Sequence, residues 1–423
     1  PLTSIFSTQH RDSLTEGLRI SGADCIIVLI RVFGPRLAIR TLDEARAAVE
    51  SVSAGFDELL ARHVEMHRAG DGRLKLDLRS PDAARPNEPL LLESFNGEVS
   101  TALAEKMFNF GRYLLFTSSR PGGWPANLQG LWNGDYLPAW SSDYHNDENI
   151  QMNYWPALPG NLPETLEPYV DYYEASVPCY QHNARALYGC RGILAPVAQD
   201  LKGRSTAPMG GFAIWTAGAG WLAQPLLDYW RYTQDDDFLA RRAIPFLEQV
   251  ALFYEDYLFE QDGRLVFSPS LSPENRPEAA DGSHIDSFAT INATMDVAVA
   301  REVLASLCEG CRHLGIKADS VQRWEGMLAR LPEYAVNADG AIKEWIHPSL
   351  YDHYGHRHLS HVYPLFPGFE ITRETHPELF EACRVAVEKR RVLGQDAQSG
   401  WSLAHLANIY ARLNDGDKAL GCL

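Results

Sequence analysis

Residues Trp140–Trp155 read WSSDYHNDENIQMNYW and join a loop of aromatic, acidic and amide side chains to a helix expected to begin near Asn149. Such a mixture is rarely needed for stability alone, because a packed core is built mainly from apolar side chains. Aromatic rings can stack on the apolar face of a sugar, while short polar side chains bind its hydroxyl groups. The stretch therefore predicts a helical scaffold whose loops carry a carbohydrate site.

An alternation of helices and loops continues from residue 97 to the end of the chain. Every second helix follows a long loop rich in Trp, Gly, His and Pro, whereas the other loops are short. Two sets of helices with all elaborate loops on one rim are typical of the (α/α)6 toroid. Apolar spacing predicts the helices at 97–119, 149–158, 164–188, 213–233, 236–259, 288–314, 319–331, 359–366, 377–393 and 401–413, with another beginning at 416 and one short strand near 264–268.

The predicted fold class is mainly α, with three regions along the chain. Residues 1–40, which include β-branched runs, are expected to be the end of an N-terminal β-domain, and 41–92 a helical linker region that ends in a proline-rich connection at 80–92. Residues 93–423 form the toroid. A six-pair ring needs twelve helices, and the pattern supplies ten and the start of an eleventh. We therefore expect the ring to lack its last helices.

Composition excludes several classes of partner. The formal charge of −17 argues against nucleic acid and against an anionic membrane surface, but it does not disfavour a neutral ligand. No run of eighteen apolar residues predicts a membrane span. Seven unevenly spaced cysteines do not form a disulfide framework, and Cys308 and Cys311 lack the partners of a zinc site. The chain starts at Pro1 rather than at Met, so we expect it to belong to a longer protein.

The loop at 140–149 presents polar side chains at the start of a helix. His145, Asp147 and Asn149 stand at alternate positions where helix N–H groups favour negative charge. A second interpretation is that Asp147 or its neighbour simply caps the helix. Capping does not explain the histidine and the flanking rings, so we expect Trp140 and Tyr144 to be walls of a sugar site.

Two further loops each offer one residue of interest. In 209–221, Trp215 is either a stacking wall or a buried packing residue. The loop 268–275, SPSLSPEN, contains two prolines that stiffen the backbone before Glu274. We expect Glu274 to be a general acid whose pKa the site raises, the alternative being a carboxylate at a helix start.

The last two loops carry histidines and a tryptophan. Residues 353–361, HYGHRHLSH, invite a metal interpretation, but the spacing is not HExxH and no acidic ligand follows. Sugar binding by neutral imidazoles and Arg357 is favoured, so no metal and no cofactor are expected. The predicted sugar-binding residues of these loops are His356, His358, His361 and, in 395–401, the possible wall Trp401.

The order and spacing of these motifs resemble glycoside hydrolase family 95. The motifs are GRYLLFTSSRPG (111–122), PANLQGLWN (125–133), WSSDYH…NIQMNYWPAL (140–158), SPSLSPEN (268–275), GHRHLSHVYPLFPG (355–368) and SGWSLAHLANIYARLNDGD (399–417). The resemblance implies an N-terminal β-sandwich, a linker, a six-hairpin glycosidase toroid and a C-terminal β-domain. It also implies inverting exo-hydrolysis of terminal 1,2-linked α-L-fucose, with α-L-galactosides as an alternative.

The resemblance assigns roles to particular residues. The general acid falls on Glu274. The family positions water with two asparagines in His-Thr-Asn-Ile-Asn, which a downstream aspartate activates; the histidine falls on His145 and the second asparagine on Asn149. Asp147 replaces the first asparagine. It is therefore either the base that accepts the proton of water or a lesion, meaning a misplaced charge that weakens activity.

Two further departures from the family pattern are visible. No Asp-Gly-Asn-Phe-Gly-like motif is found, and Asp415 and Asp417 are expected on the opposite rim. Gln224 and Pro225 stand where the family often has a histidine-containing helix. The expected partner is a fucosylated glycan, cleaved by an exo-fucosidase or, alternatively, only bound by a catalytically impaired relative.

Overall fold

The computed structural model describes residues 21–31, 41–95, 97, 99–207 and 211–423, and the chain divides into two compact units, Pro1–Arg73 and Leu74–Leu423. The first unit contains helices α1 (Leu42–Glu50) and α2 (Phe56–Asp71). A capping box starts α1, because Thr41 Oγ1 accepts the Glu44 N–H and the Glu44 carboxylate accepts the Thr41 N–H. Both helices lie in the region 41–92, which was predicted to be helical.

The β-domain expected at 1–40 falls largely on residues outside the described part of the chain. The described portion, 21–31, is exposed and has neither helix nor strand. The end of a β-domain therefore stays a prediction, as does the division of the chain near residues 40 and 92.

The second unit begins with two helices, α3 (Asn87–Ser94) and α4 (Thr101–Ser118). Residues 80–92 were predicted as a connection between regions, and α3 begins within this stretch at Asn87. Pro89 lies in the first turn of α3, where helix N–H groups have no intrahelical partner, so its missing N–H costs little.

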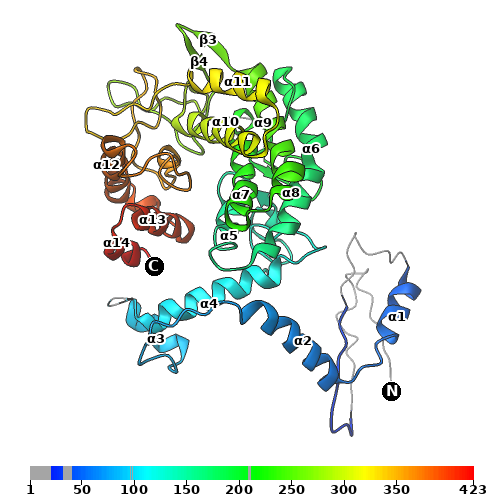
Figure 1. The fold of residues 1–423 in the computed structure, drawn as a ribbon. Helices are drawn as coiled ribbons and strands as arrows, with labels where there is room; N and C mark the ends of the chain where they lie inside the picture. Colours follow the sequence, from blue (N-terminus) through cyan, green and yellow to red (C-terminus); the bar gives the residue numbers. More distant parts are fainter. Residues whose placement is uncertain (1–20, 32–40, 96, 98, 208–210) are drawn as a thin grey trace. The chain divides into compact units, whose positions relative to one another are not determined.

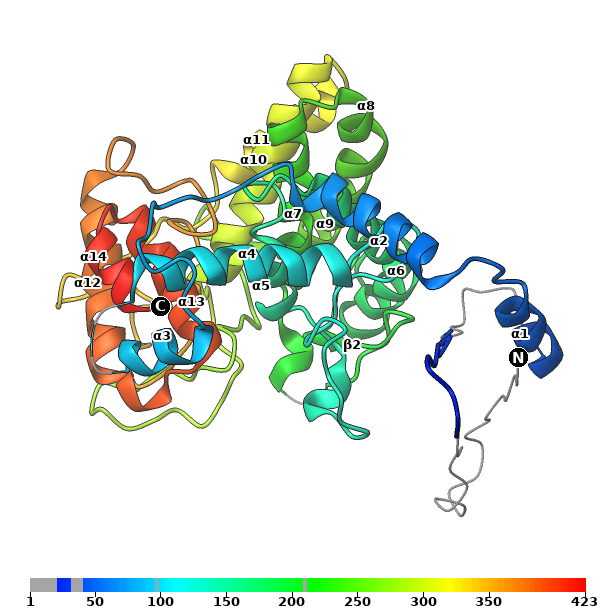
Figure 2. The same cartoon turned by 90° about the horizontal axis from the view of Figure 1, so that it is seen from below.

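A series of helices then forms most of the second unit. Figure 1 shows α6, α7, α9 and α10 packed together, while α12, α13 and α14 form a separate group, and the two groups stay distinct in Figure 2. The helices are α5 (Asn149–Tyr154), α6 (Leu166–Tyr188), α7 (Gly218–Thr233), α8 (Asp236–Phe238), α9 (Ile244–Tyr257), α10 (Thr294–Leu314), α11 (Ala318–Leu328), α12 (Pro377–Leu393), α13 (Gly400–Arg412) and α14 (Gly416–Gly421). Short 3-10 turns occur at Ala139–Ser142, Pro163–Thr165, Gly211–Ile214, Ser360–Val362 and Gln395–Ala397.

Prolines explain two differences from the predicted helices. The segment 359–366 was predicted to be a helix, but only the 3-10 turn Ser360–Val362 forms, because Pro364 and Pro367 cannot supply the N–H groups of a longer helix. In the predicted helix 236–259, Pro245 follows a π-helical turn, Leu239–Ala243, that widens the helix before α9.

Among the described residues, four short strands pair in two antiparallel ribbons. β1 (Tyr144–His145) pairs with β2 (Ala198–Gln199), and β3 (Phe259–Gln261) pairs with β4 (Arg264–Val266). The strand predicted near 264–268 is confirmed as β4, but the pairing of β1 was not foreseen, since two residues are too few to show a period. This ribbon holds the loop before α5 against the chain at residues 197–199.

Among the described residues of the second unit, two large apolar cores and a small cluster of Leu90, Ala102 and Leu103 are buried. The larger is built from side chains of α5–α11, and the smaller from α12, α13 and the segment 341–371. A buried ion pair connects them, because Arg390 of α12 contacts Glu344 at 2.7 Å and Glu344 also accepts hydrogen bonds from the loop 268–275. In the described part of the chain, no helix is both long and apolar enough to cross a membrane.

Candidate active site

The loop before α5 is anchored by a buried asparagine. The Asn146 N–H donates to Val197 O at 2.6 Å, and its side-chain amide donates to Pro196 O and Gln199 Oε1 at 2.7 and 2.9 Å. Its Oδ1 accepts the hydroxyl of Tyr173 at 2.8 Å. With every polar atom of its amide engaged, Asn146 fixes the backbone from which His145 and Asp147 project.

Helix α5 begins without a side-chain cap. Its N-cap residue is Glu148, which has φ 149° and ψ −44° and makes no capping hydrogen bond. Such a φ is rare outside glycine and is retained at sites where the surroundings enforce it. Neither Asp147 nor Asn146 caps the helix, so the capping interpretation does not account for these side chains.

Asp147 is a buried carboxyl group beside other acids. Burial, with smaller contributions from the charges of Glu274 and Glu148, raises its pKa to about 6 against the lowering effect of His358 and His145. Because Glu274 contributes to this shift, the two candidate catalytic carboxyls lie within electrostatic reach of each other. Asn149 is the first residue of α5 and is half-buried.

The loop 268–275 holds Glu274 from a rigid base. Ser270 Oγ donates to Asp296 of α10 at 2.5 Å, and Ser272 Oγ donates to Glu344 at 2.6 Å. The amide of Asn275 donates to Glu344 Oε2 at 2.8 Å. Glu274 has φ 57° in a turn rather than at a helix start, so the alternative interpretation of a helix-start carboxylate is not supported.

Two cationic side chains contact Glu274. Arg357 Nη2 donates to its Oε2, and His358 Nε2 lies 3.2 Å from the same oxygen. The hydrogen bond to His358, together with the charges of His358 and Arg357, lowers the pKa of Glu274 to about 2 although burial opposes this. The expectation that the site raises this pKa is therefore wrong.

His358 lies between two acids. Its Nδ1 is 3.3 Å from Glu148 Oε2, and its Nε2 faces Glu274, so both ring nitrogens point at carboxylates. These contacts raise the pKa of His358 to about 9 although the ring is buried. Glu148 also pairs with His405 of α13. The pKa of Glu148 falls to about 2 because both imidazoles outweigh the effect of burial.

A cavity of about 270 Å³ opens beside Glu274 and is large enough to hold a sugar ring. His145 lines it and contacts Asp143 at 2.5 Å, while Thr206 donates to the other oxygen of Asp143 at 2.6 Å. Among the predicted walls, Trp140 lines this cavity and is 71% exposed. The full lining is Trp140, Ser141, Asp143, His145, Val197, Ala198, Thr206, Ala207, Phe212 and Glu274.

Several predicted sugar-binding residues are buried in the protein instead. Tyr144 packs on Tyr172 with ring centroids 4.5 Å apart, and Trp215 is 1% exposed within the larger core. For Trp215 the packing interpretation fits. His361 is also buried, with its Nδ1 4.0 Å from Glu344.

The remaining predicted residues surround Glu274. The half-buried Trp401 contacts His358 with ring centroids 4.8 Å apart. His356 stacks on His358 with ring centroids 5.1 Å apart. Burial, together with the charges of His358 and Arg390, lowers the pKa of His356 to about 3. The expected neutral imidazoles therefore fit His356 and His361, whose pKa falls to about 4, but not His358.

Three residues of the site were missed from the sequence. Glu148 was not singled out, although it takes the place of the isoleucine in His-Thr-Asn-Ile-Asn. His405 was visible in SGWSLAHL but had no partner in sequence, and Asp143 lay two residues before a predicted site histidine. For Glu148, the available signal was a charged residue at the position where the family pattern has an apolar isoleucine.

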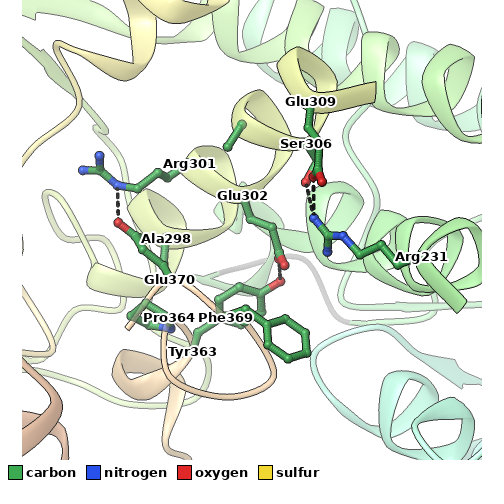
Figure 3. Close-up of a pocket in the computed structure, with 12 residues that line it drawn as sticks. Arg231, Ala298, Arg301, Glu302, Ser306, Glu309, Tyr363, Pro364, Phe369 and Glu370 are labelled. Carbon is green, nitrogen blue, oxygen red and sulfur yellow. Dashed lines mark hydrogen bonds and ion pairs between the residues drawn. The ribbon is translucent and has the colours of Figure 1, made fainter. Parts of the chain in front are cut away.

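Other parts of the described chain could bind ligands but lack this arrangement. Glu278, His284 and His353 could hold a metal ion, since their ligand atoms lie within 4.8 Å of one another. A second cavity, of about 310 Å³, is shown in Figure 3. Its charges are paired with one another: Arg231 contacts Glu309 at 3.0 Å, Arg301 contacts Glu370 at 3.3 Å and Tyr363 donates to Glu302.

Helical pairs that carry acids, imidazoles and aromatic rings on their loops define the toroid-type glycosidases. Within that class, the chain belongs to glycoside hydrolase family 95, since residues 55–423 match the glycosyl hydrolase family 95 catalytic domain. A putative kojibiose phosphorylase from the human microbiome has a similar fold, with TM-score 0.52 and 11% identity over 88% of this chain and 53% of that one. The predicted fold class is confirmed.

Named relatives agree with this assignment. Alpha-L-fucosidase 2 of Arabidopsis thaliana is 34% identical over 391 residues, which are 89% of this chain and 46% of the relative. Probable alpha-fucosidase A of Aspergillus niger is 28% identical over 88% of this chain and 48% of the relative. The chain thus spans about half the length of the curated relatives it matches.

Proposed function

We propose that this protein is an exo-acting α-L-fucosidase that releases terminal 1,2-linked fucose from oligosaccharides with inversion at the anomeric carbon. The observation that carries the proposal is the sugar-sized cavity lined by Glu274 and His145, together with Asp147, a buried carboxyl group two residues after His145 whose pKa the charge of Glu274 helps to raise. Family membership and the names of the relatives support the sugar, and the linkage and stereochemistry follow from the resemblance described above.

The proposed reaction is a single displacement by water. Glu274 delivers a proton to the glycosidic oxygen as the C1–O bond breaks and its electron pair passes to that oxygen. Water, positioned with the help of the Asn149 amide, attacks C1 from the opposite face and loses a proton to Asp147. The products are β-L-fucose and the alcohol, and the proton gained by Asp147 returns to the site through solvent.

The pKa values of the unliganded site set one condition on this assignment. Glu274 is ionised at rest and Asp147 is half-protonated near pH 6, which is the reverse of the order needed at the moment of reaction. His358 Nε2 nevertheless lies 3.2 Å from Glu274 Oε2, so in this proposal the pair shares one proton, which rests on His358. In coupled groups the proton belongs to the pair, so it remains available to Glu274 when substrate excludes water.

Residues around the cavity provide the sugar contacts in this proposal. Trp140 is the exposed ring that can stack on the apolar face, and His145, held by Asp143, points a polar edge into the same cavity. Arg357, which contacts Glu274, also lies near the Trp401 ring at 5.9 Å. These groups bind a neutral sugar without needing an anionic substrate.

Hydrolysis of a matched panel tests the function. The protein should release fucose from a 1,2-linked α-fucosyl oligosaccharide, and more slowly from 1,3- and 1,4-linked isomers. Glu274→Gln should reduce kcat/KM by roughly 10³-fold or more, whereas the matched change Glu278→Gln, four residues later in the chain, should leave it within about threefold. Faster cleavage of aryl α-L-galactoside would favour the alternative substrate, and glycan binding with no hydrolysis would favour a binding role.

A further inference from the structure

The buried carboxylate of Glu148 has no part in the reaction proposed so far. Its side chain is 4% exposed and comes from a backbone position with φ 149°, which a non-glycine residue adopts only under constraint. Burying an ionised carboxylate is costly unless cations compensate it. The compensation here comes from two imidazoles, His358 and His405.

The two contacts of Glu148 are ion pairs rather than aligned hydrogen bonds. His358 Nδ1 lies 3.3 Å from Glu148 Oε2, and His405 Nδ1 lies closer to Oε1. A bare ring nitrogen would turn its lone pair toward the carboxylate and repel it. Each imidazole is therefore more stable with a proton on the nitrogen that faces Glu148.

His358 faces a second carboxylate on its other edge. Its Nε2 is 3.2 Å from Glu274 Oε2 with hydrogen-bond geometry. Since a neutral imidazole has one N–H only, it could satisfy one of these two carboxylates and would repel the other. The arrangement Glu148–His358–Glu274 thus selects the doubly protonated ring.

The surroundings of His358 limit how this ring can exchange its proton. Trp401 covers it with ring centroids 4.8 Å apart, and the ring itself is 5% exposed. The charged and titratable groups that act on it come from four elements: Asp147 and Glu148 before α5, Glu274 in the loop 268–275, His356 and Arg357 in its own loop, and His405 of α13 beyond Glu148. The attraction of the ring to Glu148 and Glu274 outweighs its repulsion by the neighbouring cations.

We propose that Glu148 is a positioning residue that holds His358 as an imidazolium, so that the Glu274–His358 pair keeps the proton that the leaving group takes. This inference rests on the proposed function. In the step, the Nε2–H bond of His358 breaks as its proton passes to Glu274, and Glu274 passes a proton to the glycosidic oxygen. His358 becomes a neutral ring whose Nδ1–H still faces Glu148, and it regains its proton from solvent after product leaves.

The variant Glu148→Gln tests this role because it removes the charge and keeps the size of the side chain. The basic limb of the kcat/KM profile should move to lower pH by about one unit or more, while activity near pH 6 stays within roughly threefold of the parent. The titration of the His358 ring, followed by NMR and assigned with His358→Gln, should move down by a similar amount.

A second variant separates charge from packing. His405→Gln perturbs the same buried cluster but leaves the carboxylate of Glu148 in place, so the His358 midpoint should stay within about half a unit of the parent. An unmoved basic limb and an unmoved His358 midpoint in Glu148→Gln would overturn the proposal. If the parent protein hydrolyses no fucoside, the proposed function fails, and the NMR titration still decides whether Glu148 holds the proton on His358.

Discussion

The buried ion pair between Arg390 and Glu344 should dominate the stability of the loop that carries Glu274. Arg390 is fully buried in α12, and its Nη2 lies 2.7 Å from Glu344 Oε2. Glu344 also accepts hydrogen bonds from Ser272 and Asn275, on either side of Glu274. Arg390→Leu would leave a buried carboxylate with neutral donors only.

The size of the effect follows from the cost of an uncompensated buried charge. Breaking such a pair by removing one partner costs about 3–5 kcal/mol. At about 2 °C per kcal/mol for a domain of this size, the Tm should fall by roughly 6–10 °C. The pKa of Glu344 is lowered to about 2 by Arg390 and His361 against the effect of burial, so this stabilisation is present above pH 4.5 and is lost as pH falls toward 2.

Thermal denaturation at pH 7 with two companion variants provides the assay. Arg391→Leu, an exposed neighbour on the same helix, should change the free energy of unfolding by less than about 1 kcal/mol. Adding Glu344→Gln to Arg390→Leu should recover part of the loss, because it removes the orphaned charge and leaves an amide oxygen that can accept the hydrogen bond from Ser272. A loss below about 1 kcal/mol for Arg390→Leu would refute the reasoning.

Three further predictions concern the site and its scaffold. Asp147→Asn should lower kcat by roughly 10²-fold or more if Asp147 accepts the proton of water, and stopped assays with an aryl fucoside measure it; a rise in kcat would identify Asp147 as a lesion. The pKa of His358 is raised, so its contribution to stability is complete below about pH 6.5 and disappears as pH rises through about 9; urea unfolding should show this slope, and a parent and His358→Gln with equal slopes would contradict it. Gly192→Ala should cost about 2 kcal/mol or more in the same measurement, since φ is 70° and a Cβ would lie 2.2 Å from Gln249 O; a neutral result would show that this turn can relax.

Much of the fold could be predicted because a helix shows a characteristic spacing of apolar residues within its own sequence. The apolar spacing placed α6 and α12 within two residues of their observed ends and gave the end of α10, although the predicted start of α10 was six residues too early. Local patterns failed where proline or tertiary contacts decide the outcome. The segment 359–366 has helical spacing but contains Pro364, and β1 depends on a partner more than fifty residues later in the chain.

The candidate site was only partly predictable. Glu274, Trp140 and His145 come together at one cavity as expected, since loops of one rim converge. Whether a ring faces that cavity or the core depends on tertiary packing, which is why Trp215 was left open between the two and Tyr144 was misplaced. The charge state of His358 depends on Glu148 and Glu274, residues 210 and 84 positions away, and no local pattern shows that encounter.

The stereochemistry of hydrolysis tests the central claim most directly. Proton NMR of the first minutes of cleavage of a 1,2-linked α-L-fucosyl oligosaccharide would identify the anomer of fucose that forms before mutarotation. The proposed roles of Glu274 and Asp147, with water between them, predict that β-L-fucose forms first and that its signal is absent with Glu274→Gln. Initial formation of α-L-fucose would mean a covalent intermediate and would contradict the account.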